Sequence, residues 1–392
     1  MKTIYKEKII NPERYILDKK MTPEVLKKAI DDALIKIDKL WDDVHGNFPS
    51  HASVANVYLE EENIGGWHTG FWTGMLWHAY EATGDEKYKE RALSHIDSFY
   101  KRIDEKISVN HHDMGFLYVP SCVAAYKLTG NEKAKEAAIM AADHLAGRYI
   151  ENGGYIQAWG QVGEQPRLII DCMNNIPLLY WAADETGDKS YYTKAYNHAD
   201  VTIKNIVRYD GSTYHTYFFK DDGSPDKGVT HQGASDDSCW ARGQAWIISG
   251  LPISYRYTQN KDMPEIFEQV TNYYLNRLPE DFIPYWDLIF QDGVSEPRDT
   301  SAASIAVCGI LEMLPYVKDE ELKNIYKGAV DKIMYSLYEY YSTKNIADSN
   351  GLLLHAVYSK PHNIGVDECN IWGCYYYMEA LLRMYKGSKA YW

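Results

Sequence analysis

A short turn recurs along the chain, and it constrains the fold more than any other feature of the sequence. The tripeptides Thr83-Gly84-Asp85, Thr129-Gly130-Asn131 and Thr186-Gly187-Asp188 are near copies, and Thr258-Gln259-Asn260 is a degenerate fourth. Each follows an apolar segment rich in small residues and precedes a charged amphipathic segment. A glycine after the last helical residue, followed by Asp or Asn, is typical of a C-cap leading into the next N-cap. Each unit therefore indicates a helical hairpin.

The periodicity of the segments between these turns predicts twelve helices. In the second unit Ala134, Ala137, Ala138, Ala141 and Leu145 fall on one helical face. Apolar helices are predicted near residues 70–82, 115–128, 173–185, 240–256, 301–314 and 369–385. Charged helices are predicted near residues 22–43, 86–100, 132–148, 190–207, 264–277 and 320–338. Six inner and six outer helices make an all-α (α/α)6 toroid, and the variable spacing of the turns favours a closed ring over an open solenoid.

Composition and charge narrow the class of protein. The 392 residues are 45% hydrophobic and 24% charged, as in ordinary soluble globular proteins. No linker divides them, so we expect one catalytic domain over residues 1–392, with residues 1–20 as an N-terminal extension. The net charge of −14, without a basic block, argues against nucleic acid or an anionic membrane as a partner. A monomer or homodimer is expected.

The location in the cell is predicted from the apolar segments and the cysteines. No apolar run approaches the ~20 residues that cross a bilayer, and residues 1–20 contain no signal-peptide core. The six cysteines form no C-x-x-C pair and mostly lie in apolar runs. We therefore predict reduced core cysteines in a cytoplasmic protein.

The aromatic residues suggest a sugar site. The 34 Tyr and 11 Trp far outnumber the 9 Phe, and amphipathic aromatics suit walls that are apolar but also form hydrogen bonds. A tyrosine-rich core is the alternative. We assign Trp77 and Trp181, inside predicted helices, to the core. The tryptophans at or near helix starts are candidates for stacking on a sugar ring: Trp67, Trp159, Trp240 and Trp246.

Chemistry-bearing residues gather at one end of the predicted ring. Consecutive hairpins make the six inner helices parallel, so their N-terminal ends share one rim. Helix N-termini favour negative charge, so we expect a cleft for an anionic ligand there. Arg242 is expected to support binding of that ligand, with a structural pairing to Asp236 or Asp237 as the alternative.

Two carboxylates at this rim differ from ordinary helix caps. Asp113 follows two histidines, and Asp171 ends the apolar strip 168–170, where burial is expected to raise its pKa. Paired carboxylates with separated pKa values are the usual equipment for acid–base work on glycosidic carbon. By contrast, we interpret Asp299 and Asp367 as N-caps.

Cofactor and metal motifs are missing from the sequence. There is no H-E-x-x-H, no Cys/His ligand spacing, no P-loop and no G-x-G-x-x-G. His215 and His231 lie in the segment 208–239, which we predict as a loop region, and we interpret them as hydrogen-bonding residues. We expect neither a metal nor a cofactor.

Four strings resemble a known family of enzymes. They are G-G-W-H-T-G-F-W (65–72), H-H-D-M-G-F (111–116), R-L-I-I-D-C-M-N-N (167–175) and D-D-S-C-W-A-R-G-Q-A-W (236–246). They are similar, in order, to the unsaturated glucuronyl hydrolases of glycoside hydrolase family 88. That family's (α/α)6 barrel agrees with the helix count obtained from periodicity.

The resemblance implies an unusual hydrolysis. Such enzymes act on oligosaccharides left by polysaccharide lyases, hydrating the C4=C5 enol ether of a terminal 4,5-unsaturated uronic acid. Asp171 matches the family's general acid and base, and Asp113 matches the carboxylate that holds the ring hydroxyls. Positions similar to those lining the family's sugar site are His112, His215, Gln232, Trp240, Arg242 and Tyr358.

One stretch departs from members that prefer sulfated chondroitin units, which carry Ser-x-x-Ser-x-Lys. The matching stretch here reads His355-x-x-Tyr358-x-Lys360, with the lysine but neither serine. The resemblance thus implies only partial sulfate recognition through Lys360. Glycosaminoglycan fragments are the expected substrates. An unsaturated rhamnogalacturonyl hydrolase, a conventional inverting glycosidase and a non-enzymatic helical scaffold are the alternatives.

Overall fold

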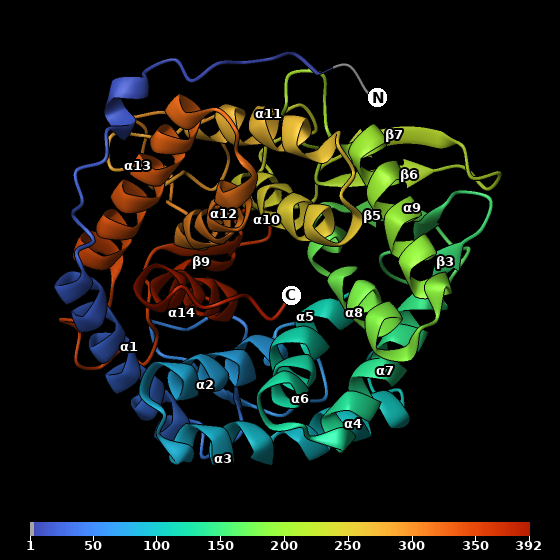
Figure 1. Ribbon diagram of the computed structural model, residues 1–392, viewed down its shortest axis with the longest axis horizontal. Coiled ribbons are helices and arrows are strands. Elements are labelled where there is room, and N and C mark those ends of the chain that lie inside the picture. Colours follow the sequence, from blue (N-terminus) through green and yellow to red (C-terminus); the bar gives the residue numbers. More distant parts are fainter. Residues whose placement is uncertain (1–3) are drawn as a thin grey trace.

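Six inner and six outer helical segments close into a ring in the computed structural model, which describes residues 4–392 (Figure 1). The inner segments are α2 (Thr69–Thr83), α5 (Met114–Tyr118) with η2 (Val119–Val123) and α6 (Ala124–Thr129), η3 (Ile170–Asn174) with α8 (Pro177–Thr186), α10 (Ala241–Thr258), α12 (Thr300–Met313) and α14 (Ile371–Lys386). The outer helices are α1 (Pro23–Asp43), α3 (Glu86–Ser94) with α4 (Ile96–Asp104), α7 (Glu132–Ala146), α9 (Lys189–Ile206), α11 (Met263–Leu275) and α13 (Glu320–Ser336). Helix α1 packs against α14 and α2 and closes the ring. The predicted (α/α)6 toroid is confirmed.

The recurring turns join inner to outer helices as predicted. Gly84, Gly130 and Gly187 end their helices in the left-handed conformation, with φ of 72°, 69° and 76°. Each residue that follows is an N-cap whose side chain accepts a hydrogen bond from a backbone N–H of the next helix. Left-handed φ suits glycine because it has no Cβ. In the fourth copy Gln259 takes this conformation at φ 51°.

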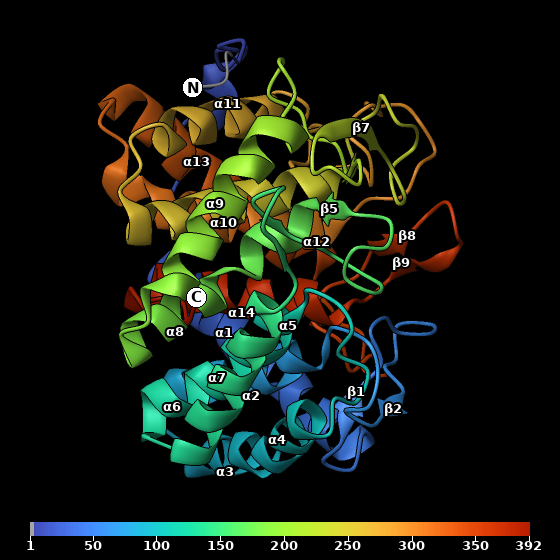
Figure 2. The same cartoon turned by 90° about the vertical axis from the view of Figure 1, so that its right-hand side faces the viewer.

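Small antiparallel sheets gather at one side of the ring, and the sequence pattern does not predict them. The segment 208–239, predicted as a loop region, contains β6 (Thr216–Phe219) and β7 (Pro225–Val229), which pair with β5 (Arg167–Ile169). A hairpin of β8 (Ala356–Ser359) and β9 (Ile364–Glu368) precedes α14. Figure 2 shows β5, β7, β8 and β9 together on that side, with β1 (Phe48–Pro49) and β2 (Glu60–Glu61). A further pair is β3 (Tyr149–Ile150) and β4 (Tyr155–Ile156).

A glycine lies at each of the six seams between neighbouring inner segments. A Cβ atom added to Gly309 of α12 would lie 2.3 Å from the carbonyl oxygen of Ile248 in α10. At the other five seams a Cβ would also come within 3.0 Å of the neighbouring inner segment. It would meet backbone atoms at Gly70, Gly115 and Gly250, and side-chain atoms at Gly74 and Gly373. Any larger residue would push two inner helices apart, so the ring depends on these glycines.

The last residues of the chain return into the centre of the ring (Figure 1). The Trp392 side chain is 2% exposed and stacks on Tyr376 with ring centroids 6.0 Å apart. Its indole N–H donates to Glu379, and its edge meets Phe116 at 6.3 Å between centroids. The C-terminal tryptophan thus fills the centre of the ring behind Phe116.

The remaining predictions about core residues can be compared directly. Trp77 and Trp181 are buried, as predicted, and all six cysteines are buried and free. Residues of the N-terminal extension lie along α11, where the Tyr15 hydroxyl donates to the Leu275 carbonyl at 2.6 Å. Among residues 4–392, no helix is both long and apolar enough to cross a membrane.

The seams give a direct stability test. Gly309→Ala should lower the free energy of unfolding by about 1–3 kcal/mol, because its methyl group meets backbone that cannot rotate away. Gly147→Ala is the matched control, since its Cβ would lie no closer than 3.4 Å to its nearest neighbours. Urea unfolding measures both. Equal midpoints for Gly309→Ala and the wild type would show that the inner ring does not need this close approach.

Candidate active site

A cavity of about 590 Å³ opens at the rim where the inner segments begin. The β5-β6-β7 sheet and the end of β8 form part of its wall. Eleven of the thirteen predicted site residues line it: Trp67, Asp113, Trp159, Asp171, His215, His231, Gln232, Trp240, Arg242, Trp246 and Tyr358. The structure therefore agrees with the prediction that the candidate catalytic and binding residues converge at one rim of the ring.

Aromatic side chains make much of this wall. Trp67 and Trp246 both pack against Phe116, with ring centroids 5.4 Å and 5.0 Å from it. Trp159 stacks on the His111 ring at 4.6 Å and 19°, and His215 lies 4.5 Å from Trp240. These contacts hold the ring planes in place, so flat apolar faces are presented to a ligand.

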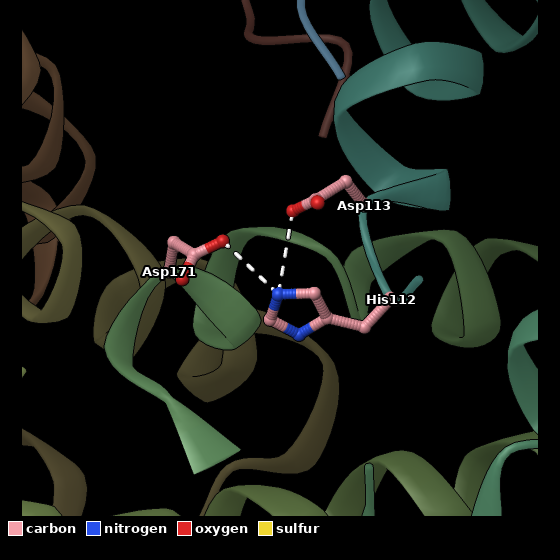
Figure 3. A group of neighbouring side chains, drawn as sticks. All are labelled: His112, Asp113 and Asp171. Atoms are coloured by element: carbon pink, nitrogen blue, oxygen red, sulfur yellow. Dashed lines mark ion pairs between the residues drawn. The ribbon is translucent and has the colours of Figure 1, made fainter. Parts of the chain in front are cut away.

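The two carboxylates face the same nitrogen of one imidazole (Figure 3). His112 Nε2 is 3.4 Å from Asp113 Oδ1 and 3.3 Å from Asp171 Oδ2. Asp113 immediately precedes α5, and Asp171 lies in η3. Their side chains are 3% and 14% exposed, whereas that of His112 is 1% exposed and lies behind them. His112 therefore contacts the acid pair and does not line the cavity.

Two buried residues that the sequence does not identify as site residues position Asp113. The Asn175 amide donates to Asp113 Oδ1 at 3.2 Å, and its carbonyl oxygen accepts from the Phe116 N–H at 2.9 Å. His111 Nδ1 lies 3.1 Å from Asp113 Oδ2. Asn175 ends the third of the family-like strings, so the string marks the segment without revealing this role.

The pKa values of the pair separate in the direction opposite to the one expected. Burial raises the pKa of Asp113 well above its ordinary value, and the Asp171 carboxylate adds to the rise. Burial also acts on Asp171, but His112 and a hydrogen bond to Asp113 outweigh it, so the pKa of Asp171 lies below its ordinary value. The expected rise at Asp171 is wrong because the apolar strip before it does not reveal His112, which comes from another segment.

Arg242 is held by protein acceptors. Its guanidinium is 1% exposed and donates to Asp299 at 2.9 Å, to Gln232 at 2.9 Å and to the Tyr358 carbonyl at 2.6 Å. The alternative of a structural pairing is correct in kind, but the partner is Asp299 and not Asp236 or Asp237. Arg242 thus fixes two other lining residues, Gln232 and Tyr358.

The remaining predictions give mixed outcomes. Asp299 caps α12 as predicted, accepting from the Ser301 N–H at 3.1 Å. Asp367 is not an N-cap: it lies in β9 and pairs with His355, and Asn370 caps α14. Lys360 follows β8 and does not line the cavity.

Several lining residues were missed because they lie on short strands. Thr216 and Phe218 of β6 and Val229 of β7 face the cavity together with Thr230. The run 214–219 (YHTYFF) is rich in aromatic and β-branched residues, and Asp222-Gly223 follows it. That combination is the signal of a hairpin and could have predicted this wall.

The geometry around the acid pair bears on whether it could bind a metal ion. His112, Asp113 and Asp171 each offer one atom that could ligate a metal, and these three atoms lie within 4.8 Å of one another. However, the Asn175 amide donates an N–H to Asp113 Oδ1 at 3.2 Å. An N–H at a carboxylate oxygen competes with a cation, so we assign none of the three as a metal ligand.

Comparison with known proteins identifies the family. The model of Glycosyl Hydrolase Family 88 matches residues 36–387. The chain belongs to glycoside hydrolase family 88. It is 48% identical to the unsaturated chondroitin disaccharide hydrolase of Streptococcus agalactiae, over 100% of this chain and 99% of the relative, and 38% identical to the unsaturated glucuronyl hydrolase of a Bacillus species, over 93% and 98%.

Solved structures of this family agree with the fold. A mutant of the Streptococcus agalactiae unsaturated glucuronyl hydrolase, complexed with dGlcA-GalNAc6S, superposes with a TM-score of 0.91 at 45% identity over the whole of both chains. The family and these relatives assign the chain a glycosidase activity of the unsaturated glucuronyl hydrolase type.

The separated pKa values predict opposite stability effects for two isosteric variants. The raised pKa of Asp113 means that wild-type stability falls as pH rises from ~3.9, the ordinary pKa of Asp, towards the folded-state value. Asp113→Asn has no carboxyl group to titrate and does not lose this stability. The melting temperature of Asp113→Asn relative to that of the wild type should therefore increase as pH rises. The lowered pKa of Asp171 stabilises the fold above ~3.9, so Asp171→Asn should be less stable than wild type at neutral pH and regain equality in acid. Circular dichroism melts at several pH values measure both, and parallel curves for the two variants would contradict the assignment.

Proposed function

We propose that this family 88 enzyme releases 4,5-unsaturated glucuronic acid from the non-reducing end of lyase-generated glycosaminoglycan oligosaccharides of the chondroitin, hyaluronan or heparin type. The observation that carries the proposal is the pair Asp113 and Asp171, joined by His112 in an aromatic-walled cavity. Relatives named for unsaturated chondroitin disaccharides and a related complex with dGlcA-GalNAc6S support the substrate class.

In the proposed reaction Asp171 protonates C4 of the enol ether. The positive charge that develops at C5 is stabilised by the ring oxygen, and water adds there while the Asp171 carboxylate takes up one of its protons. The hemiketal so formed opens and releases the neighbouring sugar, so the net change is the addition of one water. Asp171 lines the cavity and its side chain is 14% exposed, so substrate and water can reach it.

The other lining residues bind the sugar. Asp113 accepts hydrogen bonds from ring hydroxyls, and the indole faces of Trp67, Trp159, Trp240 and Trp246 stack on the ring. The N-terminal ends of the inner segments favour the uronate carboxylate. Gln232 and Tyr358, both held by Arg242, supply polar contacts with His215 and His231.

The distance between the carboxylates argues against an inverting displacement at C1. An inverting glycosidase separates its carboxyl groups by ~6.5–9.5 Å so that a water fits on the far side of the sugar. Here the facing atoms of Asp113 and Asp171 lie within 4.8 Å of one another. Both groups therefore act on the same region of the sugar, as protonation and hydration of one double bond require.

The proposal extends to specificity and to place of action. Lys360 lies outside the cavity lining, so we expect sulfate to contribute to binding through it only partially and non-sulfated disaccharides to be good substrates. The six buried free cysteines fit action in the cytoplasm, by a monomer or homodimer.

Isotope incorporation tests the reaction type. Turnover of an unsaturated chondroitin disaccharide in deuterium oxide should place deuterium on C4 of the product, on one face, because a fixed Asp171 donates the proton. Mass spectrometry and proton NMR measure it, and a saturated glucuronide should not be cleaved. A product without deuterium at C4 would indicate displacement, and activity confined to pectin-derived substrates would indicate a rhamnogalacturonyl hydrolase.

Asp171→Asn tests the proton donor. The amide keeps the shape of the side chain but has no transferable proton, so kcat should fall ~10²–10⁴-fold. Disaccharide binding, measured by calorimetry, should remain within a few-fold of wild type. A variant with near wild-type kcat would remove Asp171 from the mechanism.

A further inference from the structure

The protonation of His111 is fixed by its neighbours. Its Nε2 lies 3.0 Å from the Ser108 carbonyl oxygen, which can only accept, so Nε2 carries the hydrogen. Its Nδ1 accepts from the Asp113 backbone N–H at 3.1 Å, so Nδ1 presents a lone pair. Burial, with the charge of Arg102 second, lowers the pKa of His111 to about 3 and keeps this ring neutral.

The same lone pair faces the side chain of Asp113. Asp113 Oδ2 lies 3.1 Å from His111 Nδ1, where an ionised carboxylate would set lone pair against lone pair. A protonated carboxyl group would instead donate its hydroxyl hydrogen to Nδ1. The other oxygen, Oδ1, accepts from the Asn175 amide at 3.2 Å and lies 3.4 Å from His112 Nε2. The surroundings of Oδ1 therefore suit a carbonyl oxygen, and those of Oδ2 suit a hydroxyl group.

The charges around Asp113 are consistent with a neutral acid. The Asp171 carboxylate from η3 opposes a second negative charge. The cations of neighbouring elements, Arg102 of α4 and Arg148 after α7, are engaged with acceptors such as the carbonyls of residues 66 and 157. Two histidines near Asp171, His198 of α9 and His215 just before β6, are kept neutral by burial, which lowers each pKa to about 3.

We propose that His111 is a positioning residue that stores the catalytic proton on Asp113 in the resting enzyme. This inference rests on the proposed function. Ring hydroxyls that donate to Asp113 stabilise its carboxylate, and the proton then moves to Asp171. The His112 Nε2 hydrogen passes to Asp171 while the proton of Asp113, turned towards His112, replaces it. The pair carries one negative charge before and after, and Asp171 becomes the acid that C4 requires.

Two variants of His111 separate its acceptor atom from its ring. His111→Asn keeps an acceptor, its Oδ1, where Nδ1 was, but loses the stack on Trp159. His111→Phe keeps the ring and the stack but loses the acceptor. The measurement is the pH dependence of kcat/KM on an unsaturated chondroitin disaccharide, whose alkaline limb marks loss of the proton from the free enzyme.

The proposal predicts that the pH of the alkaline limb depends on whether residue 111 offers a hydrogen-bond acceptor to Asp113. In His111→Phe the alkaline limb should move to lower pH by about one unit, since one hydrogen bond to the neutral acid is worth about that much. In His111→Asn the limb should stay at the wild-type pH, whatever the turnover rate. An unmoved limb in His111→Phe, or an equal shift in both variants, would overturn the proposal.

A spectroscopic measurement on ligand-free enzyme tests the protonation of Asp113 directly. It does not depend on the folding of the His111 variants or on the proposed function. Infrared difference spectra of ligand-free wild type against Asp113→Asn should show the carbonyl band of a protonated carboxyl group at neutral pH. A carboxylate band in its place would overturn the proposal. If instead this carboxyl band is present but no unsaturated disaccharide is hydrolysed, the proposed function fails and the proton storage stands.

Discussion

Backbone contact between the inner segments is the constraint on which the rest of the structure depends. At each seam a glycine lets two segments approach so closely that a Cβ atom would overlap the neighbouring segment. That approach makes the ring narrow enough for the chain's own Trp392 to fill its centre. It also brings residues at the starts of α2, α5, η3 and α10 around one cavity of about 590 Å³. Side chains separated by more than two hundred residues, such as Asp113 and Tyr358, can therefore face one ligand.

One of these seams also sets the chemistry. Gly115 of α5 lies against the backbone of Asn175, so the start of α5 and the end of η3 cannot move independently. The Asn175 side chain then bonds both the Phe116 N–H and the Asp113 carboxyl group. The spacing of the acid pair is thus a property of the helix packing. Burial, which the same packing causes, raises the pKa of Asp113.

The sequence predicts most of the helices and only part of the site, for physical reasons. Helices are local: their period and their Gly-Asp caps lie within a few residues, and the predicted bounds agree with structure to within a few residues. Family-like strings locate Asp113 and Asp171 because their flanking residues are specific. Local patterns contain no information on long-range partners, which is why Asp299 as partner of Arg242, 57 residues away, was missed. The lowered pKa of Asp171 was missed for the same reason, since it depends on His112.

The charge balance of the cavity explains why a neutral Asp113 suits this enzyme. The proposed substrate carries a carboxylate, and the chain has a net charge of −14. The charge of Arg242 is already matched by buried Asp299, so this arginine neutralises little of a ligand's charge. A cavity with both acids ionised would set two negative charges against the uronate in surroundings that screen them weakly. Keeping a proton on Asp113 removes one of these charges before the substrate arrives. Release of this proton to His112, which passes its own hydrogen to Asp171, then supplies the acid that C4 requires, so binding an anion and protonating carbon become one requirement on the same pair.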